Sequence, residues 1–509
     1  MAESKLKGGL PGCEGSRTIL VYAHRPIPRA MCDLELLQAT ADFYPKDFAM
    51  PGSTCRYSRT IRSVLFGTAL LSCLALRSMQ AAPAEPDVPR YDLVLTGGHV
   101  LDAKNHRDGM MDVAVKDGRI AEVAPHIDPK LAVKSVAVHG LYVTPGLIDI
   151  HVHVYAGTGE KDSYAGDNSV YPDGFTFRNG VTTVVDAGSS GWRSFEDFKQ
   201  RVIDRSHTRV LAFLNIVGAG MRGPKYEDNL DDMDGQATAA MIEKYPQILI
   251  GIKSAHFDGP EWKPYDQALI AGNLAHVPIM IDFGANRPER PLYELLTNKL
   301  RQGDIYTHMY SGLRGEQNPE TRGPSQAMLN GRKRGIYFDV GHGGGSFNWS
   351  VAAPLMKAGF TPDSISTDLH ITSMNAGMKD MLNVADKLLV LGQTVPQVIE
   401  EMTAAPAHEI RHDELGNLSV GSPADIAVLR VEPGSFGFID MNNAREDGTK
   451  KLECELTIHD GKVVYDLNGM SSDTWHQAPT SDYKQARRWT LQQTKPDAAT
   501  PANEGAPTH

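Results

Sequence analysis

The middle of the chain alternates apolar runs of strand length with longer amphipathic segments. Eight runs rich in apolar and β-branched residues are bounded by turn residues and predict strands. These runs cover residues 143–153, 181–188, 209–217, 248–254, 278–284, 304–311, 336–344 and 364–370. Segments such as PYDQALIAGNLAH separate most of them and predict helices. Eight strand–helix units in about 270 residues are typical of an α/β fold of the (β/α)8 TIM-like barrel type. A doubly wound sheet shares this alternation, but no G-x-G-x-x-G motif opens a helix after the first strand.

Both flanks of this region alternate polar and apolar residues, as strands with one exposed face do. The segments YDLVLTGGHVLD and MDVAVKDGRIAEVAP lie upstream, and CELTIHDGKVVYDLNG lies downstream, each with a glycine-containing turn signal. We therefore predict a small β-sandwich domain formed from both flanks, residues 83–142 and 416–470, around a barrel of residues 143–415. The tail, residues 471–509, is rich in Pro, Thr, Gln and Ala and is expected to be loosely ordered.

The region before the first flank has the pattern of a secretory signal peptide. Arg56, Arg59 and Arg62 precede the apolar run VLFGTALLSCLAL, and the small-residue segment MQAAPA follows it. The run is too short for an ordinary membrane span. We expect residues 50–82 to be a signal peptide and residues 1–49 to be an over-extended start, which predicts an exported protein, periplasmic or secreted. An N-terminal extension with an internal apolar helix is the alternative. Of the five cysteines, only Cys454 lies beyond the expected cleavage, so the mature chain is predicted to have no internal disulfide.

The composition says little about the fold, but it limits the kinds of partner that the protein is expected to bind. The 509 residues are 41% hydrophobic and 22% charged, which is ordinary for globular proteins. The net charge of -11 argues against nucleic acid or an anionic membrane as the partner. We expect a small-molecule substrate and no stable membrane span in the mature form, and the sequence is compatible with a homo-oligomer.

The first predicted strand ends in two histidines one residue apart. His151 and His153 project from the same face of a strand, with Asp149 on the same side. Imidazole is a ligand for zinc and related divalent ions. An isolated H-x-H pair is also compatible with two ordinary polar residues at a strand end. A metal site therefore requires further ligands at the ends of the other strands. Catalytic groups of a barrel sit at the C-terminal ends of its strands, and the later ends carry further candidates: Lys253, Asp282, His308 and Asp368.

Lys253 needs a chemical change before it can bind a metal. An ammonium has no lone pair and an ordinary pKa of about 10.4. Reaction with carbon dioxide converts the amine into a carbamate with two oxygen donors, which can bridge two cations. Burial lowers the pKa of a lysine and makes that reaction accessible. The alternative is an ordinary lysine at a strand end.

Seven segments together resemble the amidohydrolase superfamily, and within it the deacetylase-like branch related to dihydroorotases. They are VTPGLIDIHVHVY, GVTTVVDAG, GIK, THMYSG, FDVGHGGGSF, DSISTDLH and LGNLSVGSPADIAVL. The resemblance covers about residues 91–469. The resemblance implies a metal centre with two ions, usually zinc. It implies that His151, His153 and Asp368 hold one ion, that carboxylated Lys253 bridges, and that His308 holds the other. The water or hydroxide between the ions would be the nucleophile, and Asp368 would move its proton.

One position departs from the pattern of that family. A histidine usually stands on strand five as a ligand of the second ion, and this chain has Asp282 there. A carboxylate also binds zinc, at about 2.0–2.2 Å, and it favours harder ions such as Mn²⁺. Alternatively, Asp282 lies behind the ligands and the centre holds a single ion. We predict that Asp282 is a ligand, and we do not assign the nearby His256 and His276 as replacements.

The loops after strands three, six and seven supply candidate substrate contacts. We predict Arg222, Tyr310, Arg314 and His342 in this role, because the βα loops line the mouth of a barrel. The HGGG segment at His342 resembles the oxyanion loop of serine esterases, but the chain lacks the G-x-S-x-G motif which that interpretation requires. A glycine-rich turn with a structural histidine is the alternative. The acidic stretch YEDNLDDMDG misses the spacing of a calcium loop and is expected to be a solvated loop.

These predictions combine into a metal-dependent hydrolase that cleaves an acyl amide or ester. A cyclic amidohydrolase of the dihydroorotase type is one alternative, because the choice of leaving group depends on loop shape rather than on the fold. A non-catalytic barrel scaffold is the other, and the complete set of candidate ligands argues against it.

Overall fold

The computed structural model describes residues 89–476, which lie in one unit of the chain, Ala82–His509. The predicted over-extended start (1–49), the predicted signal peptide (50–82) and nearly all of the predicted tail therefore lie outside the described residues. No helix in the described part of the chain is long and apolar enough to cross a membrane.

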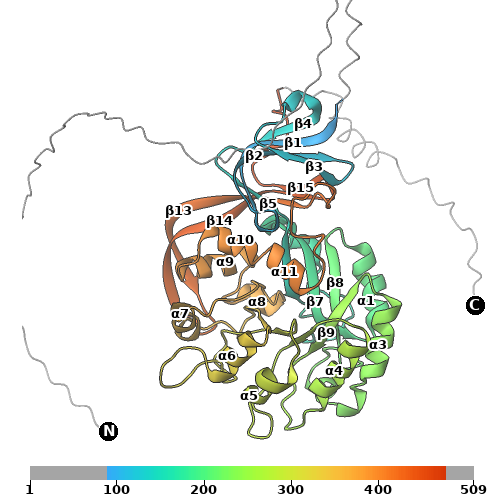
Figure 1. The fold of residues 1–509 in the computed structure, drawn as a ribbon. Helices are drawn as coiled ribbons and strands as arrows, with labels where there is room; N and C mark the ends of the chain where they lie inside the picture. The colour runs from blue at the N-terminus through green and yellow to red at the C-terminus, as the bar shows by residue number, and fades with distance from the viewer. Residues whose placement is uncertain (1–88, 477–509) are drawn as a thin grey trace, which may run out of the picture. The chain divides into compact units, whose positions relative to one another are not determined.

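Strands from both flanks form one eight-stranded sheet. The first flank contributes β1 (Tyr91–Asp102), β2 (Arg107–Lys116), β3 (Arg119–Ala124), β4 (Ala132–Ala137) and β5 (Tyr142–Pro145), and the second contributes β13 (Ile426–Ile439), β14 (Arg445–His459) and β15 (Lys462–Asp466). The two sets join where β5 pairs antiparallel with β13, with Val143 opposite Val428. Both of these valines belong to one apolar cluster with Leu93 and Leu456. The blue and orange-red strands of Figure 1 therefore share one core.

The middle of the chain forms a curled, seven-stranded parallel sheet in sequential order. Its strands are β6 (Leu147–Val152), β7 (Val181–Gly191), β8 (Arg209–Asn215), β9 (Leu249–Ser254), β10 (Ile279–Ile281), β11 (Ile305–Tyr306) and β12 (Tyr337–Phe338). The eighth predicted run, residues 364–370, contains no strand of this sheet. It instead makes isolated parallel bridges to both sheet edges, at Val152–Leu369 and Asp339–Ser364. Side-chain hydrogen bonds from Ser364 and Ser366 to Asp339, at 3.0 and 2.7 Å, hold this segment.

Helices connect the parallel strands, and α1, α3 and α4 lie beside β7, β8 and β9 in Figure 1. The α-helices are α1 (Phe195–Arg201), α2 (Pro224–Glu227), α3 (Gly235–Lys244), α4 (Lys263–Leu274), α5 (Leu292–Glu294), α6 (Gln326–Lys333), α7 (Trp349–Lys357), α8 (Ile371–Asn375), α9 (Met381–Val390), α10 (Val395–Glu400) and α11 (Ala404–Glu409). Asp234 caps α3 by accepting hydrogen bonds from the N–H groups of Gln236 and Ala237. One residue of the predicted acidic loop is thus a helix cap.

The first predicted strand, residues 143–153, is divided at Gly146. The N–H group of Gly146 donates to the carbonyl of Asp425 at 2.8 Å, and a Cβ at this position would lie 2.2 Å from Oγ1 of Thr182. Residues 143–145 therefore belong to the flank sheet, and their assignment to the barrel was wrong. The division anchors β6, which carries the two histidines, to the flank sheet at its start.

Candidate metal centre

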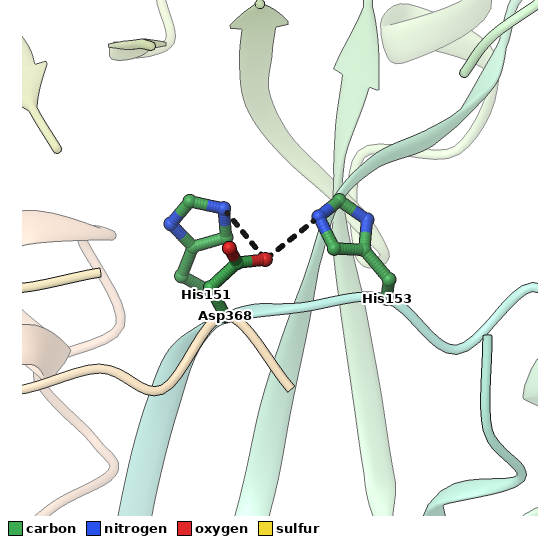
Figure 2. Close-up of side chains that lie close together, drawn as sticks. All are labelled: His151, His153 and Asp368. Carbon is green, nitrogen blue, oxygen red and sulfur yellow. Dashed lines mark ion pairs between the residues drawn. The ribbon is translucent and has the colours of Figure 1, made fainter. Parts of the chain in front are cut away.

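Three predicted ligands converge at the carboxyl end of β6. Nε2 of His151 and Nε2 of His153 lie 3.6 and 3.1 Å from Oδ1 of Asp368, and Figure 2 shows the carboxylate between the two rings. The donor atoms of the three residues all lie within 4.8 Å of one another, and all three residues are buried. Oδ1 of Asp368 has no hydrogen-bond partner despite its burial. We call these three residues the first half of the centre.

Hydroxyl groups behind the two histidines orient the rings. Nδ1 of His151 lies 3.0 Å from Oγ1 of Thr307, whose hydroxyl donates to Oδ2 of Asp339 at 2.6 Å. Because Thr307 gives its proton to Asp339, it accepts from Nδ1–H of His151, and the lone pair of that ring is on Nε2. Nδ1 of His153 likewise lies 2.9 Å from the hydroxyl of Ser189. Such outer partners fix the tautomer of metal-binding histidines.

The electrostatics of the first half favour a cation. Burial lowers the pKa of His151 to about 4 and that of His153 to about 3, so both rings are neutral near pH 7. Burial would raise the pKa of Asp368, but the interactions of its carboxylate with the neighbouring imidazoles, first of them that of His370, outweigh it and hold the pKa well below its usual range. Nε2 of each neutral imidazole thus faces an ionised, buried carboxylate oxygen that has no hydrogen-bond partner. Such an arrangement needs a cation between its members, and the donor set suits a divalent ion such as zinc.

Lys253 lies at the end of β9, next to the first half. Its Nζ is 3.0 Å from Nε2 of His151 and 3.6 Å from Sδ of Met280. The residue is 1% exposed, and burial lowers the pKa of its amine. A neutral amine in this position has the lone pair that reaction with carbon dioxide requires.

Asp282 and His308 form a second group just beyond the ends of β10 and β11. Nε2 of His308 lies 3.3 Å from Oδ2 of Asp282, and Nδ1 of His308 lies 2.5 Å from the carbonyl oxygen of Gly341. Arg314 donates from Nη2 to Oδ1 of Asp282 at 2.6 Å. Burial would raise the pKa of Asp282, but the guanidinium of Arg314 outweighs it and keeps the carboxylate ionised. Arg314, predicted as a substrate contact, is thus an ion-pair partner of Asp282.

His256 also reaches this group, although it was not assigned as a ligand. Its Nε2 lies 3.4 Å from Oδ2 of Asp282, and its Nδ1 lies 2.6 Å from Oε2 of Glu227. Glu227 is 4% exposed, so the prediction of a solvated acidic loop was wrong for this residue. The sequence feature that could have identified His256 as a site residue is its position, three residues beyond Lys253 at the same strand end.

Two further aromatic side chains, which were not predicted, lie beside the centre. The ring of Tyr164 lies 4.4 Å from that of His153 and 5.7 Å from that of His256 between centroids. Nε2 of His370 lies 3.7 Å from Oδ2 of Asp368. Tyr164 therefore lies next to histidines of both groups.

Three of the four predicted substrate contacts do not join the centre. The hydroxyl of Tyr310 is buried against Sδ of Met356 and the carbonyl of Phe360, at 3.0 and 3.4 Å. Both ring nitrogens of His342 are occupied, by Lys387 at 2.6 Å and by the carbonyl of Gly343 at 2.8 Å. The polar atoms of these two residues thus have partners in the core, and their role as substrate contacts stays a prediction. Arg222 is partly exposed and pairs with Glu160, at 2.8 Å from Nε.

Comparison with known proteins places the chain in a family. No family model matches it. It is 32% identical over 347 residues to a deacetylase of Brucella anthropi, an alignment that covers 66% of this chain and 83% of the relative. The structure matches a crystal structure of an adenine deaminase with a TM-score of 0.67 at 28% identity, over 74% of this chain and 100% of the other. It matches a crystal structure of a dihydroorotase with a TM-score of 0.65 at 28% identity, over 74% and 99% of the two chains. The chain therefore belongs to the amidohydrolase superfamily and is a metal-dependent hydrolytic enzyme, related to deacetylases and dihydroorotases.

Proposed function

We propose that the chain hydrolyses an acyl amide or ester of a small molecule. The observation that carries this proposal is the buried Oδ1 of Asp368, which has no hydrogen-bond partner and lies between Nε2 of His151 and Nε2 of His153. The name of the Brucella relative, a deacetylase, supports an acyl group as the part of the substrate that is removed.

We also propose that residues 364–370 close the parallel sheet as the eighth strand of a (β/α)8 barrel. The bridges from Leu369 to Val152 and from Ser364 to Asp339 support this closure. Asp149 supports it too, because its carboxylate accepts a hydrogen bond from the N–H group of Thr367 at 3.1 Å. In such a barrel all the candidate ligands lie at the C-terminal ends of strands, where barrel enzymes carry their active sites.

In this proposal the first half of the centre and a carboxylated Lys253 hold divalent ions, with zinc as the first choice. A bound divalent ion polarises a carbonyl group and lowers the pKa of water to about 7. Asp368 accepts the proton of the attacking water as its oxygen bonds to the carbonyl carbon. Asp368 then donates that proton to the leaving nitrogen or oxygen as the bond to the acyl carbon breaks. Thr307 and Ser189 hold the two histidine rings in place throughout.

Hydrolysis of a cyclic amide is the second candidate function, because the structure is similar to that of a dihydroorotase. The two activities share the ligands and differ in the substrate. A screen of N-acyl amino acids, acyl esters and cyclic imides with the metal-loaded protein separates them. We expect turnover of an N-acyl amino acid or acyl ester that is lost in His153→Ala. Turnover of cyclic imides alone would favour the second candidate, and turnover of no substrate class would contradict the proposal.

We further propose that the enzyme acts outside the cytoplasm. The succession of arginines, apolar run and small residues over residues 56–84 supports export. Sequencing the N-terminus of the natural protein tests this: a start near Ala82 is expected, and a start before Val64 would contradict it.

A further inference from the structure

His256 lies in the loop that follows β9, and its ring is directed at the carboxylate of Asp282. Oδ2 of Asp282 has an imidazole Nε2 on either side, from His256 at 3.4 Å and from His308 at 3.3 Å. The first half of the centre has the same arrangement, with one carboxylate oxygen between two Nε2 atoms. Lys253 lies in β9, the strand that precedes His256, and contacts the first half. Two groups of histidine, carboxylate and histidine thus lie next to one lysine.

A buried carboxylate fixes the ring of His256. Oε2 of Glu227 lies 2.6 Å from Nδ1 of His256, and Oε1 of Glu227 accepts from the N–H group of Gly223 at 2.9 Å. With Nδ1 held by Glu227, the other ring nitrogen is the one available on the side of Asp282. A carboxylate behind a histidine is the usual partner of a metal-binding imidazole, which it orients and makes more basic.

The backbone of His256 has a conformation that two of the predicted ligands share. His256 has a φ of 60°, in the left-handed region, as do His308 at 63° and Asp368 at 52°. A residue other than glycine costs about 1 kcal/mol or more in this region, and such strain concentrates at functional sites. His256 shares this conformation with one predicted ligand from each half of the centre.

We propose that His256 is a metal ligand and completes a second half of the centre with Asp282 and His308. It would supply the imidazole that the family pattern places on strand five, where this chain has Asp282. Glu227 is its positioning residue, and Arg314 balances the charge of Asp282 from the far side. The proposal rests on the metal-dependent function proposed above, and it assigns two divalent ions to each chain.

The second half differs from the first in the spacing of its donor atoms and in the exposure of one of its histidines. Its donor atoms are not grouped within the 4.8 Å that the first half satisfies. The side chain of His256 is 37% exposed, whereas that of His308 is 5% exposed. Binding of one ion by all three residues therefore requires their donor atoms to come closer together than they are in this structure.

Metal content after loading with Zn²⁺ and removal of free ions tests the proposal, by elemental analysis of the folded protein. We expect two ions per chain in the wild type and one in His256→Ala. Glu227→Gln, which keeps the shape of the side chain, should weaken the second ion by about 10–100-fold, the usual effect of losing such a partner. His276→Ala is the matched control, because His276 is an exposed histidine with a φ of 55° and precedes β10. It should retain two ions.

The outcomes separate this proposal from the proposed reaction, because ions are counted without any substrate. Two ions in His256→Ala, at native circular dichroism, would overturn the assignment of His256. A wild type that binds one ion, retained in His256→Ala, would overturn it as well. A wild type with two ions that hydrolyses no compound in the screen would leave the metal assignment standing and contradict the proposed function.

Discussion

The two halves of the centre use different partners to hold their imidazoles. In the first half, neutral hydroxyl groups of Thr307 and Ser189 lie behind His151 and His153. In the second half, the ionised carboxylate of Glu227 lies behind His256. A hydroxyl orients a ring without adding charge, whereas a carboxylate also attracts a proton to it. The histidines of the first half are therefore neutral and can bind a metal directly. In the second half, a metal must compete with a proton for the ring of His256.

The pKa values of the histidines follow this difference. Burial lowers the pKa of His151 to about 4 and that of His153 to about 3. Burial would also lower the pKa of His256, but the hydrogen bond and charge of Glu227 outweigh it and raise the pKa to about 9. At neutral pH an ion enters the first half without displacing a proton from these rings. An ion that binds His256 must displace one, so the second ion should bind more weakly and release a proton.

The largest expected effect comes from the first half. His153→Ala, and His151→Ala equally, removes a direct ligand and should lower kcat/KM by more than about 100-fold, beyond the loss that an outer partner causes. The fold should persist, because the parallel sheet does not depend on either ring. Turnover and metal content are measured together, with His276→Ala as control. Full activity at normal metal content would contradict the assignment.

The next effect concerns the second half. Asp282→Ala should lower the metal content by one ion per chain and leave Arg314 as an unpaired buried cation, which destabilises the fold. Asp282→His should restore the ion, with a preference for Zn²⁺ over Mn²⁺, because imidazole replaces a harder carboxylate. Elemental analysis after loading with each metal checks both variants. If Asp282→Ala keeps both ions and its turnover, Asp282 is no ligand.

A smaller effect is expected behind the first half. Thr307→Val keeps the size of the side chain but removes the acceptor for Nδ1–H of His151, and should weaken the first ion by about 10-fold. The second ion should be unaffected, because the hydroxyl of Thr307 hydrogen-bonds to His151 and Asp339. Competition with a chelator measures both affinities. Equal weakening of both ions would show that the halves are not independent.

The smallest effect is a difference in titration. In the metal-free protein, NMR of labelled histidine should show His256 charged at pH 7 and losing its proton near pH 9, while His151 stays neutral down to about pH 4. Because native His256 binds its proton more tightly than the unfolded chain, it stabilises the metal-free fold below pH 6.5, and this contribution is lost as the pH rises through about 9. His151 has the opposite sign, and its contribution is lost as the pH falls from 6.5 toward 4. A neutral His256 at pH 7 would contradict the role of Glu227.

The positions of the candidate ligands at strand ends could be predicted from the sequence, because a parallel sheet brings the carboxyl ends of its strands to one edge. This reasoning placed His151, His153 and Asp368 together, and Lys253 beside them. It also placed Asp282 next to His308.

Side-chain direction in the loops could not be predicted in the same way. Tyr310 and His342 follow strands as expected, but their polar atoms are bonded within the core. His256 was not assigned because a left-handed residue returns its ring toward the strand ends, and no sequence pattern marks that conformation for a histidine. The burial of Glu227 could not be predicted either, because it lies in a stretch of acidic residues of the kind that is typical of solvated loops.

A crystal structure of the zinc-loaded protein, with anomalous diffraction measured at the zinc edge, tests the central claim most directly. We predict two anomalous peaks. One should lie at bonding distance, about 2.0–2.2 Å, from His151, His153 and Asp368. The other should lie at bonding distance from His308, Asp282 and His256. No peak at His151 and His153 would contradict the metal centre as a whole. A second peak without His256 among its ligands, or no second peak, would contradict the account of two halves.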